Sequence, residues 1–248
     1  MNKIKEWTNQ NSLKLNESKT KFIEIKRKGS NDLTNSTFAC DATAKNLGIT
    51  IDNNFSFSVQ INNVCKTGFG LLRQLWRISY KINNVSLKTQ LVHSCILSKI
   101  DYCNSLYFDL PSNQQRKLQR LLNASIRFIF NIHDRKTSIT PFLKRAHILP
   151  VSLRVRYKIC LMVYKCVYGV APIYLSKLLI AKRSLPSLRV SEDTTLLHEP
   201  RREQQNYKNR RFEVAGPHEW NLLPRSLREI SSIENFKSKL KTHFYNQY

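Results

Sequence analysis

Arginine side chains recur at helical spacing between residues 112 and 131. At about 100° per residue, Arg116, Arg120 and Arg127 fall within about 40° of one another, opposite a stripe of leucine and isoleucine. Their Cα atoms would be about 6 and 10 Å apart along a helix axis. Guanidinium groups in such a row suit successive phosphates, because each can hold a phosphate by two hydrogen bonds. A solvated outer helix face would carry the same row, so both interpretations stay open.

Two further stretches carry basic rows of the same kind. One row lies on the polar side of an amphipathic pattern in residues 61–77, and the other crosses an otherwise apolar pattern in residues 152–168. Together with the three arginines they make up our candidate nucleic-acid-binding residues. The members of these two rows are Lys66, Arg73, Arg77, Arg154, Lys158 and Lys165.

The net charge points to the same class of partner. The 248 residues hold 41 Lys and Arg against 17 Asp and Glu, a formal charge of +24, and the carboxy-terminal half carries most of the excess. Such a charge repels itself, and a polyanionic partner relieves the repulsion. We therefore expect RNA or DNA as the partner. An anionic membrane surface and an acidic protein are the alternatives.

Residues that could hold a metal or attack a substrate are scattered. The aspartates include no adjacent pair, whereas two-metal phosphoryl transfer needs carboxylates that converge on the cations. The cysteine pairs Cys95/Cys103 and Cys160/Cys166 do not have the spacing of a zinc module. Motifs of serine hydrolases, P-loop NTPases and zinc proteases are missing. The sequence thus predicts no catalytic constellation, no metal site and no cofactor in this chain.

Hydrophobic periodicity predicts a mainly α protein with a small β element, that is, an α+β chain. Helices are expected over residues 2–10, 61–77, 85–102, 112–131 and 152–168. Short strands are expected at residues 20–27 and 47–52, the second followed by a turn at Asn53-Asn54. A last helix should begin with a capping box made by Ser231 and Glu234. Its apolar stripe would consist of Ile233, Phe236, Leu240 and Phe244.

Three of these helices should form a bundle. Residues 61–77 and 112–131 are amphipathic, while residues 85–102 are apolar around nearly the whole circumference, as in a helix buried among neighbours. Two amphipathic helices packed against an apolar one would leave the basic rows outside. Residues 181–211, by contrast, are polar and basic and are expected to be a linker or arm.

The sequence shows no pattern for insertion into a membrane. No run of 18 apolar residues occurs, and the first residues lack the apolar stretch of a secretory signal. We expect an intracellular protein of the nucleus or cytoplasm that is not secreted, and whose six cysteines are reduced thiols.

Six short motifs follow one another along the chain. In order, they are Trp7-x3-Asn11-Ser12-Leu13-Lys14-Leu15-Asn16-x2-Lys19-Thr20; Leu47-Gly48-Ile49-x-Ile51-Asp52; Asp101-Tyr102-Cys103; Leu118-Gln119-Arg120 with Asn123-Ala124-x2-Arg127; Leu149-Pro150-Val151 with Arg154 and Tyr157; and Trp220-Asn221-x-Leu223-Pro224 with Phe236-Lys237-x2-Leu240. Together they resemble the C-terminal part of reverse transcriptases of non-LTR retrotransposons, of the jockey or CR1 kind. Each motif alone is weakly specific, and the strength of the resemblance lies in their order over nearly the whole chain.

The resemblance implies a division of the chain into parts of such an enzyme. Residues 1–57 would be a remnant of the palm end and primer grip, residues 58–135 a helical thumb-like bundle, and residues 136–180 a connecting helical region. Residues 181–211 would be a basic linker or arm, and residues 212–248 a C-terminal segment with the WN.LP motif. In this family the thumb lies against the template–primer backbone, so RNA and DNA would be the partners.

The resemblance also implies what this chain would lack. The family is an RNA-directed DNA polymerase that uses Mg²⁺, and its adjacent catalytic aspartates precede the motif that begins here at Trp7. We therefore expect a fragment that cannot polymerise DNA by itself; nucleotide incorporation on a primed RNA template would contradict this. Lys19 matches a lysine near the phosphates of the incoming nucleotide and would be a catalytic remnant at most. An exposed lysine before a strand is the alternative.

Two other functions fit the same residues. A stand-alone nucleic-acid-binding module in a host role would use the same basic rows. A protein-interaction domain would direct them at an acidic partner, and binding that survives nuclease treatment would favour this alternative.

Overall fold

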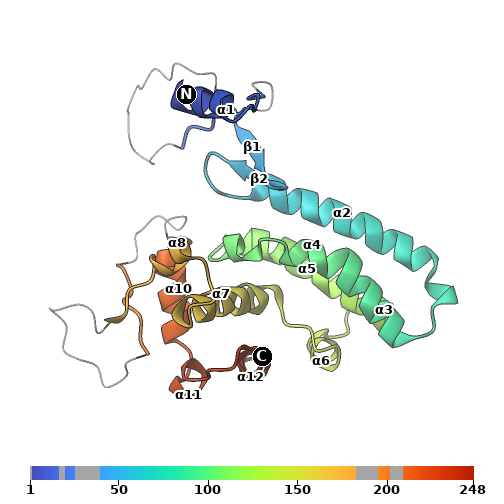
Figure 1. The fold of residues 1–248 in the computed structure, drawn as a ribbon. Helices are drawn as coiled ribbons and strands as arrows, with labels where there is room; N and C mark the ends of the chain where they lie inside the picture. Colours follow the sequence, from blue (N-terminus) through green and yellow to red (C-terminus); the bar gives the residue numbers. More distant parts are fainter. Residues whose placement is uncertain (1, 17–19, 26–39, 183–194, 202–208) are drawn as a thin grey trace. The chain divides into compact units, whose positions relative to one another are not determined.

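The computed structural model describes residues 2–16, 20–25, 40–182, 195–201 and 209–248. Over these residues the fold is mainly α-helical with a two-stranded antiparallel sheet, which confirms the predicted fold class (Figure 1). The chain divides into two compact units, Met1–Gln60 and Ile61–Tyr248. All nine candidate nucleic-acid-binding residues belong to the second unit.

The first unit contains helix α1 (Asn2–Gln10), as predicted, and a hairpin of β1 (Thr43–Asn46) and β2 (Ile49–Asp52). Leu47 and Gly48, at the hairpin turn, both have positive φ, 46° and 84°. This is the conformation of a two-residue type I′ turn, which matches the twist of the strands that it joins. The strand predicted at residues 47–52 is therefore shorter at its start. Asn53 and Asn54 form the turn predicted for them.

The prediction of a strand at residues 20–27 is wrong for the part that the structure describes. Residues 20–25 have no regular secondary structure, and residues 26 and 27 lie outside the described ranges. The backbone carbonyl of Phe22 accepts a hydrogen bond from the N–H of Asp41 at 2.7 Å. This hydrogen bond does not by itself make the regular ladder that defines a β-strand.

The carboxylate of Asp52 organises the connection from the hairpin to α2 (Ser58–Arg77). It accepts hydrogen bonds from the backbone N–H groups of Asn54 at 3.1 Å, Ser56 at 2.9 Å and Phe57 at 2.7 Å. Asp52 is 7% exposed, so these bonds satisfy a carboxylate that has little access to water. The aspartate of the Leu47–Asp52 motif therefore has a structural task, which is to hold residues 53–57 in a tight loop.

In the second unit the predicted three helices pack together (Figure 1). They are α2, of which Ile61 onward belongs to this unit; a helical stretch of α3 (Val85–Val92), a π-helical turn (His93–Leu97) and α4 (Ser98–Asp101); and α5 (Ser112–Ile129). Lys88, near the start of α3, donates to Asn131, just beyond α5, at 2.6 Å. The middle stretch therefore runs antiparallel to α5.

The middle stretch is less buried than its apolar circumference predicts. Val92, Ile96 and Ile100 are fully buried, but Val85 and Leu87 are each 45% exposed. The prediction of burial on all sides is therefore wrong for α3. An apolar pattern states which side chains would gain from burial, but not whether another element covers them.

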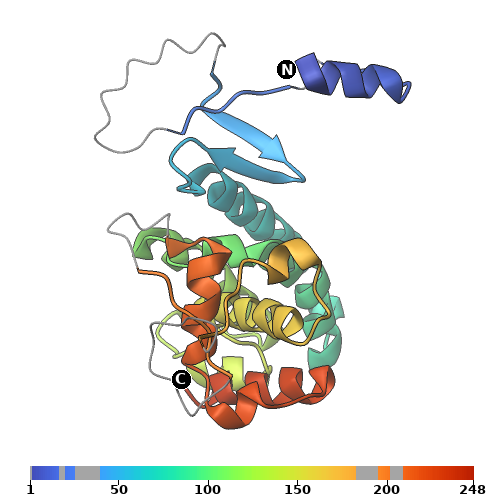
Figure 2. The same cartoon turned by 60° about the vertical axis from the view of Figure 1, so that its left-hand side comes forward.

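Helix α7 (Val151–Val167) is the centre of the second unit. It contacts α5, η4 (Asn104–Tyr107), α8 (Ile173–Ser176), α10 (Phe212–Asn221) and α12 (Ile233–Tyr245). Figures 1 and 2 show α10 and α12 beside it. Short helices α6 (Thr140–Arg145) and α11 (Arg225–Arg228) precede α7 and α12. Ile159, Cys160 and Val163 of α7 are at most 2% exposed. A helix surrounded in this way must be apolar almost all round, which is the pattern seen in its sequence.

The last helix begins one residue later than predicted. Ser232, not Ser231, is its N-cap and accepts from the N–H of Asn235 at 3.5 Å, while the carbonyl of Ser231 accepts from the Tyr164 hydroxyl at 2.6 Å. Phe236, Leu240 and Phe244 are fully buried, as the predicted stripe requires, and Ile233 is half-buried.

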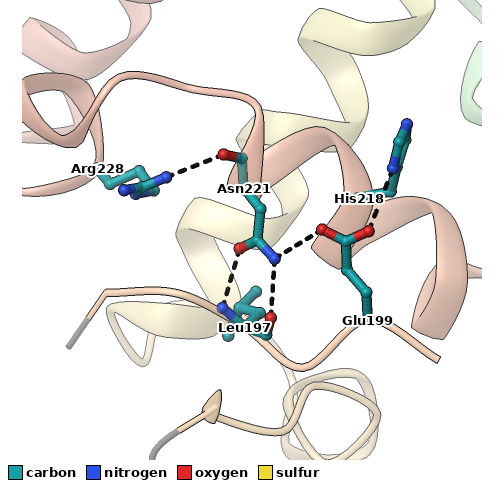
Figure 3. A network of polar contacts seen from close by, with 5 residues as sticks. All are labelled: Leu197, Glu199, His218, Asn221 and Arg228. Atoms are coloured by element: carbon teal, nitrogen blue, oxygen red, sulfur yellow. Dashed lines mark hydrogen bonds and ion pairs between the residues drawn. The ribbon is translucent and has the colours of Figure 1, made fainter. Parts of the chain in front are cut away.

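Part of the stretch expected as a linker or arm packs against the end of α10 (Figure 3). The side-chain amide of Asn221 accepts from the N–H of Leu197 at 3.0 Å and donates to its carbonyl at 2.8 Å, as a neighbouring strand would. Glu199 accepts from the same amide at 2.9 Å and lies 3.3 Å from His218 Nδ1. The indole of Trp220 donates to the carbonyl of Thr195 at 2.9 Å. Residues 195–199 are thus held by the Trp-Asn pair of the last motif.

Candidate nucleic-acid interface

Five of the predicted basic residues lie on the exposed sides of α2 and α5. Lys66, Arg73 and Arg77 come from α2, and Arg116 and Arg120 come from α5. All five are exposed, and none has a hydrogen bond or ion pair with another described residue. We call this set the α2–α5 face.

Contacts between the two helices show that they run parallel. Asn62 accepts a hydrogen bond from Lys117 at 2.8 Å near their starts. Near their ends the rings of Trp76 and Phe128 meet edge to face, with centroids 5.4 Å apart. In between, Gly68 is packed against the side chain of Leu121. Both helices therefore advance in the same direction along one seam.

The parallel arrangement puts both basic rows on the same side. On each helix, the basic row lies about a quarter turn around the axis from the residues that contact the other helix. The direction of this quarter turn on α2 is opposite to that on α5. Two such rows on parallel neighbours point to one side of the plane that contains both axes. The apolar stripes point to the other side, where Lys88 of α3 contacts the Phe128 ring at 5.3 Å.

The seam also sets the length of the face. Because Asn62 is level with Lys117 and Trp76 with Phe128, Arg116 lies near one end of the face and Arg77 near the other. The two ends are about 24 Å apart along the axes. Duplex DNA carries one phosphate charge per about 1.7 Å of axis, so the face could follow about seven base pairs. Neither helix contains an Asp or Glu.

Arg127, the third member of the α5 row, has a different role. Its guanidinium donates to the backbone carbonyls of Asp134, Arg135 and Thr137, the last two at 3.1 Å. The N–H of Lys136 and the hydroxyl of Thr137 hold the Asp134 carboxylate, and they lower its pKa. Arg127 therefore fixes the loop after α5, and its donors already have acceptors. We leave it out of the face.

The third predicted row, on α7, lines two neighbouring cavities instead of an open face. Arg154 is paired with Asp101 of α4: Nε lies 2.8 Å from Oδ1, and the second nitrogen contacts the second oxygen. Their side chains are 16% and 25% exposed. Lys158 lines both cavities, whose volumes are about 210 and 280 Å³, and Lys165 lines the larger one.

The smaller cavity gathers basic groups that periodicity does not connect. His93 comes from the π-helical turn, His147 from the residues after α6, and Lys241 from α12. Burial lowers the pKa of His93, and the charges of Arg154 and Lys241 lower it further. Burial and Arg154 also lower the pKa of Lys241. Both shifts have the sign expected where positive charge is in excess. Sequence analysis missed these three residues, because no local pattern links them.

Three of the six motifs meet at this place. The side-chain carbonyl of Gln119 accepts from the N–H of Val151 at 2.9 Å, which joins the fourth motif to the fifth. The Arg154–Asp101 pair joins the fifth to the third. Residues far apart in sequence thus contact one another through the very positions that define the motifs.

Groups for metal binding or nucleophilic chemistry do not gather in the described part of the chain. No three His, Cys, Asp or Glu side chains there are arranged to hold a metal ion. Lys19 lies outside the described residues. The thiol of Cys160 is buried, and burial raises its pKa far above the usual range, so it is a poor nucleophile.

No helix over the described ranges is long and apolar enough to span a bilayer.

Comparison with known proteins adds no relative: no family model, curated protein or solved structure matches the chain. The resemblance to reverse transcriptases therefore depends on the six motifs alone.

Proposed function

We propose that this protein binds the phosphate backbone of RNA or DNA through the α2–α5 face. One observation carries the proposal: two parallel helices without acidic residues put five exposed, unpaired cations on one side of their seam. Contacts to phosphates give affinity without reading the base sequence. The protein would therefore bind many sequences and depend strongly on salt.

We further propose that the chain is the C-terminal part of a non-LTR retrotransposon reverse transcriptase, with the α2–α5 face as the thumb surface against the template–primer. The contacts of Gln119 with Val151 and of Asp101 with Arg154 support this, because they give motif residues a shared structural task. As such a fragment the chain would be inactive as a polymerase and would meet its partners in the nucleus or cytoplasm. An upstream reading frame that encodes adjacent aspartates would support the assignment. A frame that encodes an unrelated domain would overturn it.

The binding proposal is tested by the salt dependence of affinity. Five phosphate contacts predict that log K falls against log salt with a slope of about −4.5 for duplex DNA. In the face variant, Lys66, Arg73, Arg77, Arg116 and Arg120 are replaced together by Gln. The slope of log K against log salt should be shallower by about 4 to 5 in this variant. Fluorescence anisotropy of a labelled duplex, at salt concentrations from about 50 to 300 mM, measures it.

A charge-matched variant provides the control. It replaces five other exposed basic residues by Gln: Lys45, Arg135, Lys136, Lys177 and Lys239. Both variants lose the same charge, so a purely global effect would change both slopes equally. We expect the control slope to change by less than about 1. Equal changes in the two variants would rule out the α2–α5 face as the binding surface.

A further inference from the structure

The smaller cavity, between α7 and α12, has the composition of an anion-binding site. Its charged side chains are Arg154, Lys158 and Lys241 against the single carboxylate of Asp101, and His93, His147 and Tyr157 complete the polar lining. Arg154 is already paired with Asp101. The two lysines therefore leave a net charge of about +2 when both histidines are neutral.

Hydrogen-bond donors in the cavity lack acceptors. In the described part of the chain, no side chain or carbonyl accepts from Lys158, Lys241 or His93. The hydroxyl of Tyr245 is buried without any partner there. Its ring lies 6.0 Å from the His147 ring and 5.8 Å from the Lys241 ammonium group, both of which line the cavity. Lys158, Lys241 and His93 are exposed and can donate to water, so the Tyr245 hydroxyl is the buried donor in this group that lacks a partner.

The backbone at His147 has a left-handed conformation, which allows a test by glycine substitution. This residue has φ of 54° and follows Ala146, the C-cap of α6, at a point where Ile148 N–H donates to Leu143 O at 3.0 Å. Glycine is the residue favoured at a left-handed helix end, and a side chain there costs about 1 kcal/mol. The imidazole placed at this position lines the cavity.

We propose that the α7–α12 cavity binds a phosphate monoester dianion. Lys158 and Lys241 would supply the opposing charge, and His93 and His147 would supply hydrogen bonds. A volume of about 210 Å³ equals the share of about seven waters, which leaves room for a phosphate group and a few waters. The two negative charges of the dianion balance the positive charges of Lys158 and Lys241, whereas a ligand with one carboxylate would balance only one of them. This site is separate from the α2–α5 face and does not depend on it.

The group could belong to a free small phosphate or to the terminal phosphate of a nucleic-acid strand. Titration calorimetry of the full chain with inorganic phosphate tests the shared chemistry. Lys241→Gln and Lys158→Gln should each weaken binding by about 10-fold or more, because each removes a charged donor. Lys241→Arg should restore most of it. Lys239→Gln, on the same helix but outside the cavity, should leave it unchanged.

His147→Gly separates binding from folding. Glycine suits the backbone there, so the melting temperature should stay the same or rise, while phosphate binding weakens. The face variant should keep its affinity for phosphate even if nucleic-acid binding is lost, which keeps the two proposals distinguishable. Two results would overturn the proposal. One is the absence of phosphate binding at about 10 mM, roughly 10 times the Kd of a weak millimolar site. The other is equal phosphate affinity in Lys241→Gln and Lys239→Gln.

A pair of oligonucleotides identifies the source. A single strand with a 5′-phosphate and the same strand with a 5′-hydroxyl are compared in wild type and in Lys241→Gln. If the strand end is the ligand, the phosphorylated strand binds about 10-fold tighter in wild type, and Lys241→Gln removes the difference. If a free phosphate is the ligand, inorganic phosphate binds and the two strands bind equally. Each result supports the cavity and assigns its ligand.

Discussion

The seam between α2 and α5 can be tested with two glycines of one helix. Gly68 and Gly70 both lie inside α2. A Cβ atom added at Gly68 would lie 3.0 Å from Cδ1 and 3.3 Å from Cγ of Leu121, and closer still to Cδ2. A Cβ atom added at Gly70 would meet nothing within 4 Å. The two Gly→Ala substitutions therefore have the same effect on helix propensity but different effects on the packing of α2 against α5.

The two effects can be set against each other. Alanine inside a helix is favoured over glycine by about 0.8–1.0 kcal/mol, so Gly70→Ala should raise the free energy of unfolding by that amount. Leu121 is 0% exposed and surrounded by the core, so it has little room to move away from a new methyl group. Overpacking of a core costs about 1–3 kcal/mol. Gly68→Ala should therefore lie about 1–3 kcal/mol below Gly70→Ala in stability.

Urea denaturation followed by circular dichroism measures both variants. Leu121→Ala provides a second check, because it should be less harmful in the Gly68→Ala background than alone, with a coupling energy of about 1 kcal/mol. If Gly68→Ala stabilises as much as Gly70→Ala, then α2 does not pack on α5 at this point. The common orientation of the two basic rows would then lose its basis.

Three more predictions concern the second unit. Glu219→Gln should lower the free energy of unfolding, measured by urea denaturation, by about 3 kcal/mol. The Glu219 side chain is 5% exposed and lies 2.6 Å from Arg156, which would lose its counter-charge. A loss below about 1 kcal/mol, the value of a surface ion pair, would contradict this. Asn221→Ala should cost about 1–3 kcal/mol and speed hydrogen exchange at the Leu197 amide, whereas unchanged exchange would show that residues 195–199 are held otherwise. Burial, and then Arg156, lower the pKa of His243, so the unfolded chain takes up this proton at higher pH than the folded chain. Stability should therefore fall as pH drops below about 6.5, and melting temperatures of His243→Gln should fall less steeply than those of wild type.

Periodicity was a good guide to the helices, because α2, α5 and α7 each carry an apolar stripe or core long enough to identify them. It failed where the outcome depends on a partner in space. Residues 20–25 have the composition of a strand but are not assigned to one, and Leu87 is apolar but remains exposed because no other element of the described chain packs over it. The N-cap shifted from Ser231 to Ser232 because neighbouring serines are equally suited to it.

The candidate sites divide along the same line. Spacing alone identified the basic rows of α2 and α5, but their common side follows only from the contacts Asn62–Lys117 and Trp76–Phe128. Spacing also included Arg127, whose carbonyl partners lie in a loop without a pattern. The α7–α12 cavity joins His93 to Lys241 across much of the chain, and no window of sequence contains both.

The π-helical turn at His93–Leu97 determines which residues share the cavity wall. His93 and Asp101 are eight residues apart and would stand about 80° from each other around an uninterrupted α-helix. A turn with one extra residue reduces that angle to about 20°, so both side chains point toward α7. If the same residues were wound as a regular α-helix, Asp101 would turn away from Arg154 by about 100°, whereas deleting one residue within the turn would keep the two side chains aligned. The widened turn thus accommodates one extra residue without moving the Asp101 carboxylate out of line with the Arg154 guanidinium.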